Sequence, residues 1–138
     1  MTFLLDTNAI SALIREDARM ASWLSSLRPE DRVVACAIAR GEILFGLGRL
    51  AQGRRRAALD AKARKLFSSL PCEPIPMVAG DHYANVKLAQ QRRGLSLDEN
   101  DLWLAATTLA IGATLVSRDS DFRRIDNLAV VVARSYVT

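Results

Sequence analysis

Four acidic residues stand in surroundings that are unusual for surface charge. Asp6 ends the apolar run FLLD, and Glu42 lies in RGEILFG among small and apolar residues. Asp101 opens the apolar stretch DLWLAATTLA, and Asp119 closely follows TLVS. Carboxylates gathered in one crevice repel each other and lose solvation, and a divalent cation relieves both costs. Mg²⁺ or Mn²⁺ suits oxygen ligands best and can activate water against a phosphoryl group.

The acid of the first segment also has a purely structural explanation. Asp6, Thr7 or Asn8 could cap the helix that follows, since each side chain can accept a hydrogen bond from an unpaired backbone N–H group. Glu42 has no such ready explanation, because a carboxylate inside an apolar helical stretch needs a partner. Both interpretations of Asp6 stay open at this point.

The two acids of the C-terminal half have structural alternatives as well. Asp101 could cap the helix that it opens, although Ser96 and Asp98 are nearby residues that could do so instead. Asp119 could be an ordinary turn residue. Asp121 is a further acid close to it. The case for chemistry therefore depends on the acids lying together in space.

The elements that would bring them together alternate along the chain. Apolar runs predict strands, residues with helical spacing predict helices between them, and such alternation indicates a mostly parallel sheet with helices on both faces. We therefore predict a single α/β domain over residues 1–138. In such sheets the functional crevice lies beyond the carboxyl ends of the strands, where Asp6, Ser117 and Asp119 would meet. The expected strands are residues 2–6, 32–39, 113–117 and 128–133, and the clearest expected helices are 42–50, 57–70, 83–93 and 101–111.

Composition narrows the class of protein further. The 138 residues include 19 basic and 15 acidic side chains, and this net charge of +4 favours an acidic partner such as nucleic acid. Arg54, Arg55 and Arg56 form the densest basic run, which could contact an RNA backbone or could simply solvate a helix end. The apolar runs are too short for a membrane span, the N-terminal residues do not have the pattern expected of a signal peptide, and the two cysteines lack the spacing expected of a metal site. We expect a cytoplasmic protein.

Four segments in a fixed order resemble a known family. LLDTN, RGEILFG, DENDLWLAAT and TLVSRDSDF together resemble a PIN domain, and more closely a VapC-type toxin ribonuclease of a type II toxin–antitoxin pair. The resemblance implies that the four acids of these segments ligate one or two Mg²⁺ or Mn²⁺ ions and position water for in-line attack on RNA. These are Asp6, Glu42, Asp101 and Asp119.

The resemblance also implies supporting residues and partners. Thr7, Asn8 and Ser117 would orient the metal ligands, and Asp98 or Asp121 could join the site through water. A cognate antitoxin would cover the acidic groove with its C-terminal segment. A homodimer within the toxin–antitoxin complex is the expected assembly.

Two other classes of function remain as alternatives. A haloacid-dehalogenase-like phosphatase also begins with a strand ending in Asp, but it expects a second Asp where this chain has Asn8. A non-catalytic module could bind RNA in an acidic groove without cleaving it. RNA binding without cleavage would favour the binding module, and trapping of a phospho-aspartate would favour the phosphatase.

Overall fold

A central sheet organises the chain. The computed structural model describes residues 1–132. Within this range five strands form the sheet in the order β3-β2-β1-β4-β5, and every neighbouring pair is parallel. The predicted α/β fold with a parallel sheet is confirmed. The strands are β1 (Thr2–Leu5), β2 (Arg32–Cys36), β3 (Cys72–Glu73), β4 (Thr114–Ser117) and β5 (Val130–Val132).

The central strand β1 and its neighbour β4 are apolar on both faces. In β1, Leu4 and Leu5 point to opposite sides of the sheet, and neither is exposed to solvent. Leu115 and Val116 of β4 are buried in the same way. Consecutive buried residues are typical of parallel strands with both faces covered. The apolar FLL run is therefore a strand at the centre of the sheet, and it delivers Asp6 to the sheet edge.

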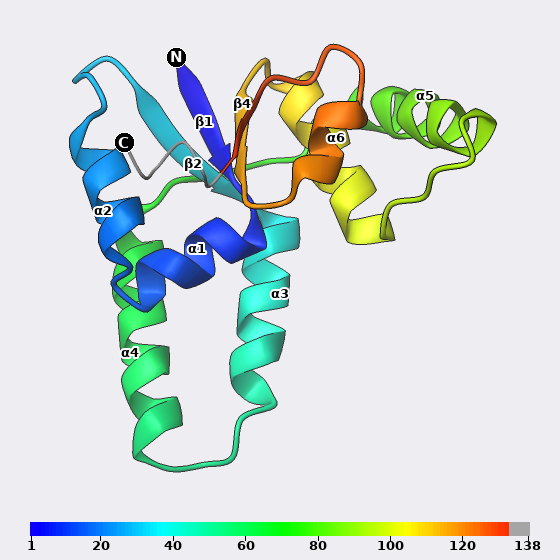
Figure 1. Ribbon diagram of the computed structural model, residues 1–138. Coiled ribbons are helices and arrows are strands. Elements are labelled where there is room, and N and C mark those ends of the chain that lie inside the picture. Colours follow the sequence, from blue (N-terminus) through cyan, green and yellow to red (C-terminus); the bar gives the residue numbers. More distant parts are fainter. Residues whose placement is uncertain (133–138) are drawn as a thin grey trace.

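The helices form two groups beside the sheet (Figure 1). In one group α3 and α4 extend away from the sheet as a long pair, and α1 packs against both. In the other group α5 packs on α6 beside β4. Within residues 1–132 no helix is long and apolar enough to cross a membrane. The helices are α1 (Thr7–Ile14), α2 (Ala18–Ser25), α3 (Ala37–Gly48), α4 (Arg54–Ser69), α5 (Ala79–Arg92) and α6 (Glu99–Ala110), with a 3-10 helix η1 (Ser120–Arg124) after β4.

The structure differs from the sequence-based prediction in several places. The predicted strand 32–39 ends at Cys36, because α3 already begins at Ala37, and α5 begins at Ala79, four residues before its predicted start. Helix α4 begins at Arg54, so the arginine run forms its first turn and does not precede it. The proline-rich passage contains the short strand β3, where the Ala35 N–H donates to the Pro71 carbonyl at 2.8 Å. Helix α6 begins at Glu99, two residues before the predicted start. Residue 133 of the last predicted strand lies outside the described residues.

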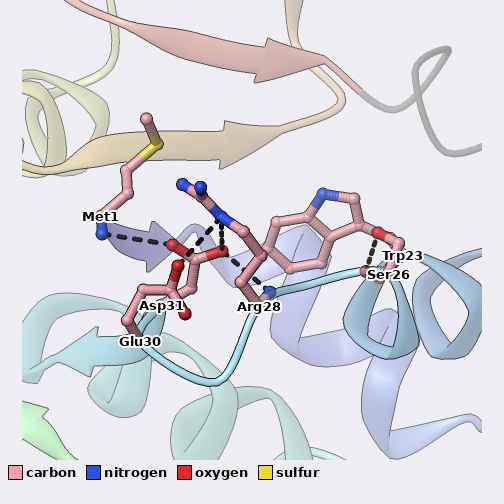
Figure 2. A network of polar contacts seen from close by, with 6 residues as sticks. All are labelled: Met1, Trp23, Ser26, Arg28, Glu30 and Asp31. Atoms are coloured by element: carbon pink, nitrogen blue, oxygen red, sulfur yellow. Dashed lines mark hydrogen bonds and ion pairs between the residues drawn. The ribbon is translucent and has the colours of Figure 1, made fainter.

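A polar cluster closes the turn before β2, at the amino ends of β1 and β2 (Figure 2). The Asp31 carboxylate accepts hydrogen bonds from the Met1 amino group at 3.2 Å and from the Arg28 backbone N–H at 3.0 Å. The Arg28 guanidinium lies 3.4 Å from Glu30. These contacts neutralise charge at the amino edge of the sheet. The candidate acids lie at the opposite, carboxyl edge.

Candidate functional site

The carboxyl edge of the sheet collects the four predicted acids. Asp6 directly follows β1, and its backbone N–H donates to the Val116 carbonyl of β4 at 3.1 Å. Asp119 lies two residues after the end of β4. Glu42 stands in the helix that follows β2, and Asp101 stands in the first turn of α6. Adjacent parallel strands therefore bring residues from four distant segments to one edge.

Electrostatic interactions link these acids at the carboxyl edge of the sheet. The pKa of Asp101 rises from an ordinary value of 3.8 to about 6. Burial is the largest cause, and the negative charges of the neighbouring acids Asp98, Asp119, Glu42 and Asp6 add to it. Burial likewise raises the pKa of Asp6, with further contributions from Asp119 and Glu42. Such effects weaken with distance, so the charges that raise the pKa of Asp6 and Asp101 lie close to these two residues. Glu42 and Asp119 thus act on both Asp6 and Asp101, and a shared catalytic role for the four acids stays a prediction.

Asp6 serves the helix and the site at once. Its side chain is 4% exposed, and its Oδ1 accepts a hydrogen bond from the Ala9 N–H at 2.8 Å, which caps α1. This bond and a contact with the Ser117 hydroxyl lower the pKa of Asp6 against the dominant effect of burial. A carboxylate has about four acceptor positions, so capping does not exhaust it. The two interpretations of Asp6 are compatible.

Glu42 has the partner that its apolar surroundings require. The Thr7 hydroxyl donates a hydrogen bond to Glu42 Oε1 at 2.7 Å. Thr7 is the first residue of α1, so this bond joins α1 to α3 and fixes the carboxylate at the edge of the crevice. The role of Thr7 in orienting a metal ligand stays a prediction.

The loop after β4 holds Asp119 through two hydrogen bonds. Its Oδ1 accepts from the Asp121 N–H at 2.8 Å and caps η1, while its own N–H donates to Ser117 Oγ at 3.0 Å. Asp119 is therefore a turn residue, as the structural alternative expected, and it also caps η1. The Asp121 carboxylate is exposed and lies 3.9 Å from an Arg124 nitrogen.

The additional acids and Asn8 differ in their relation to the site. Asp98 occupies the N-cap position of α6, but its side chain makes no capping hydrogen bond. Among the neighbouring charges, its carboxylate raises the pKa of Asp101 most, so Asp98 lies close to Asp101. Asn8 is exposed, and none of the hydrogen bonds between described residues involves its side chain. Its orienting role stays a prediction.

The donor chemistry of the crevice suits a hard cation, although direct ligation by all four acids is not preformed. Within residues 1–132 no three His, Cys, Asp or Glu side chains form a group that could hold a metal ion. Mg²⁺ commonly uses only one or two protein carboxylates and keeps several water molecules. A site of carboxylates and hydroxyls that share a field is compatible with that mode of binding. Direct ligation by Asp6, Glu42, Asp101 and Asp119 together stays a prediction.

Replacing Asp101 with Asn is expected to stabilise the metal-free protein at neutral pH. The folded state raises the pKa of Asp101, so it binds more protons than the unfolded state between pH 3.8 and about 6. Stability therefore falls as pH rises through this window. The full shift corresponds to about 3 kcal/mol, and solvent screening of this partly exposed group reduces the expected gain to about 1 kcal/mol. Urea unfolding in EDTA at pH 4 and pH 7 measures both quantities.

The exposed acid Asp81, in the first turn of α5, provides the matched control. Asp81→Asn should leave the pH dependence of unfolding close to that of the wild type. An Asp101→Asn variant that loses stability between pH 4 and pH 7 as steeply as the wild type would contradict the prediction.

A cleft of about 600 Å³ borders the acidic crevice between α1, α3 and α4. Thr7 and Glu42 form one end of it, and Arg15 and Arg55 add positive charge. Sequence reasoning missed this cleft, because apolar residues at helical spacing look the same whether they fill a core or line a groove. The apolar lining consists of Ile14, Ile43, Leu47, Leu50 and Leu59.

The arginine run divides into side chains with different surroundings. Arg56 donates to the Leu50 carbonyl at 3.3 Å and lies 3.7 Å from Asp60, so it stabilises the start of α4. Arg55 lines the cleft beside Glu42, and Arg54 is exposed. Positive charge at a helix N-terminus is unfavourable. Because Arg56 is bound within the protein, Arg54 and Arg55 are the residues of this run that remain available for phosphate contact.

A family model describes nearly the whole chain. The PIN domain model matches residues 3–128. The chain belongs to the PIN-domain family. The family assignment agrees with the four segments from which the resemblance was drawn.

Similar proteins cover this PIN domain almost from end to end. Ribonuclease VapC1 of Haemophilus influenzae strain R2866 is 29% identical over 133 residues, which span 93% of this chain and 95% of that protein. FitAcB from Neisseria gonorrhoeae is 26% identical with a TM-score of 0.79, covering 96% and 98% of the two chains. VapBC2 from Rickettsia felis, bound to a DNA fragment from its promoter, is 22% identical with a TM-score of 0.86 and the same coverage. The predicted resemblance to VapC-type PIN domains is confirmed.

Proposed function

We propose that this PIN domain is a metal-dependent endoribonuclease of the VapC type. The observation that carries the proposal is the position of Asp6, Glu42, Asp101 and Asp119 at the carboxyl edge of the sheet, where burial and then the neighbouring negative charges raise the pKa of Asp101 to about 6. A group of acids held at this cost is typical of a functional site. The similar proteins named Ribonuclease VapC1 support the same activity.

Each of the four acids would have a role in holding the metal ion. Asp6 and Asp101 would hold Mg²⁺ or Mn²⁺, with Glu42 and Asp119 as direct or water-mediated ligands. The ion would supply the polarisation of the scissile phosphate and the activation of water. Thr7 holds Glu42 in place by its 2.7 Å hydrogen bond, and the ordered loop after β4 holds Asp119.

The basic residues would guide the RNA chain toward the acids. Arg54 and Arg55 lie in the first turn of α4, and Arg55 lines the cleft that also contains Glu42. Phosphate contacts from such residues supply affinity without sequence preference. They also offset the repulsion between the acidic crevice and the RNA backbone.

An antitoxin is the proposed protein partner. The structural neighbours include toxin–antitoxin complexes, such as VapBC-1 from Haemophilus influenzae. In this chain the apolar cleft beside Thr7 and Glu42 is open and would accept a segment of such a partner, which would cover the acids. We also propose a homodimer, because Leu44 and Phe45 of α3 are exposed apolar side chains. The proposed location is the cytoplasm, where the substrate RNA resides.

Cleavage of end-labelled total cellular RNA by the purified protein tests the function. Discrete fragments are expected with Mg²⁺ or Mn²⁺, and none with EDTA, because the acids alone cannot stabilise the charge that develops on the phosphate. Addition of excess metal after EDTA should restore the same fragments. Cleavage that persists unchanged in EDTA would exclude the proposed mechanism.

One observation favours a second candidate, an RNA-binding module without catalysis. Among the described residues no ready-made metal-binding group exists. If folded protein binds RNA tightly and releases no fragments with any divalent ion, this second function replaces the first. The phosphatase alternative has no such support, because the position of its second acid is the exposed residue Asn8.

A further inference from the structure

A second pocket lies away from the acidic crevice, along one face of α5. Its volume is about 360 Å³, which is within the range of small-molecule sites. Side chains of α5 form one wall, and the segment after η1 forms the opposite wall. Val86, Leu109 and Ile125 supply apolar surface. None of the four predicted acids belongs to it.

A buried amide in this pocket has no hydrogen-bond partner among residues 1–132. Gln90 is 4% exposed, and its side chain forms no hydrogen bond with any residue between 1 and 132. It reaches this pocket and also a smaller cavity of about 60 Å³ next to Leu95. An unpaired buried amide costs about 1–3 kcal/mol, so a ligand that satisfies it gains affinity. Asn85, five residues earlier on α5, provides a second amide to the lining of this pocket.

Two arginines give the pocket an anionic preference. Arg93 Nη1 donates to the Arg124 carbonyl at 2.7 Å, which brings the two residues together across the pocket wall. A guanidinium has five N–H donors, so this single bond leaves others for a ligand. Arg124 lies 3.9 Å from Asp121, and Asp126 is the acid in the lining. Apart from His82, the lining therefore carries two positive charges, on Arg93 and Arg124, and one negative charge, on Asp126.

This combination of groups matches one class of ligand. Guanidinium groups bind phosphate oxygens, and amide side chains bind the hydrogen-bonding edges of bases. The apolar surface suits the flat face of a base. We propose that the pocket binds a nucleotide, with Arg93 and Arg124 contacting its phosphate and Gln90 and Asn85 contacting its base.

The nucleotide can be a free molecule or one unit of the RNA strand, in which case the inference rests on the proposed ribonuclease function. Helix η1 connects the two sites, since Asp119 caps its start and Arg124 is its last residue. At a rise of about 2.0 Å per residue these ends are about 10 Å apart along the helix. A single RNA strand with one phosphate at the acids can therefore place a nearby nucleotide in the pocket, where Gln90 and Asn85 would contact its base.

The chain offers matched variants for the test. Gln90→Leu removes the buried amide, and Gln91→Leu makes the same change at the next, exposed residue. Arg124→Gln removes a pocket cation, and Arg123→Gln removes its exposed neighbour. Gln90→Leu should keep or raise the melting temperature, because an unpaired amide is replaced by an apolar group of similar size.

Binding is measured in EDTA on the full chain, so cleavage plays no part. The free-nucleotide arm follows ¹⁵N side-chain amide signals while AMP, CMP, GMP or UMP is added, with the Gln90 signal identified by its loss in Gln90→Leu. The RNA arm measures anisotropy of a labelled single-stranded RNA at fixed salt. Gln90→Leu and Arg124→Gln should each weaken binding about tenfold in at least one arm, whereas Gln91→Leu and Arg123→Gln should change it less than about twofold.

Each outcome decides the proposal. Loss confined to the mononucleotide arm identifies a free-nucleotide site, and loss confined to the RNA arm identifies a site for one unit of the strand. Inorganic phosphate binding that depends on Arg124 but not on Gln90 would mean a simple anion site and would overturn the proposal. Equal effects of each variant and its matched control would overturn it as well. Failure of the ribonuclease function shows separately, as absence of metal-dependent cleavage.

Discussion

Asp6→Asn is expected to lower the rate of RNA cleavage by about 10³-fold or more. The change removes the negative charge that ends β1 and lies in the field of Glu42 and Asp119. A bound cation contributes several kcal/mol to stabilisation of the developing phosphate charge, and each 1.4 kcal/mol corresponds to a factor of ten. Fragment yield over time from a single labelled RNA measures the effect.

The same variant should remain folded, which separates catalysis from structure. Asn caps helices about as well as Asp, so the bond from the Ala9 N–H is retained. The uncharged amide also removes the cost of burying a carboxylate, and the melting temperature in EDTA should stay equal or rise. Asp81→Asn is the surface control and should cleave normally. Full activity in Asp6→Asn would remove this residue from the catalytic group.

Phe122→Ala is expected to destabilise the protein by about 3–5 kcal/mol. Phe122 is the one buried residue of η1, is 1% exposed, and joins the central core cluster. Truncation leaves a cavity under the helix that Asp119 caps, so the loop that carries this acid loses its anchor. Urea unfolding followed by circular dichroism measures the loss of free energy.

Two further variants define the origin of this effect. Phe122→Leu fills most of the space and should cost about 1–2 kcal/mol. Arg123→Ala changes the adjacent exposed side chain and should remain within about 0.5 kcal/mol of the wild type. If Phe122→Ala unfolds at the same urea concentration as the wild type, η1 is held by other contacts.

The central elements could be predicted because their residues are constrained by period and burial together. The FLL run had to be a strand with both faces covered, and strand alternation then placed Asp6 and Asp119 at one edge. Glu42 could be singled out because its apolar neighbours left it without a solvent-facing role. The structure supplied the missing partner, the hydroxyl of Thr7.

Other features depend on contacts between distant segments and leave no local pattern. Strand β3 is only two residues long and exists because the Pro71 carbonyl meets the edge of β2. Helix α4 starts at Arg54 although positive charge near a helix N-terminus is unfavourable. The buried amide of Gln90 looks like any polar helix residue in the sequence.

The position of β1 in the sheet affects when this protein can become active. The first strand made is the central one, and it pairs with β2 and also with β4, where Phe3 is aligned with Thr114. A chain emerging from the ribosome therefore carries Asp6 long before Asp101 and Asp119 exist. Contacts this distant in sequence form slowly and late. The acidic group is therefore incomplete in any nascent chain that does not yet include Asp119.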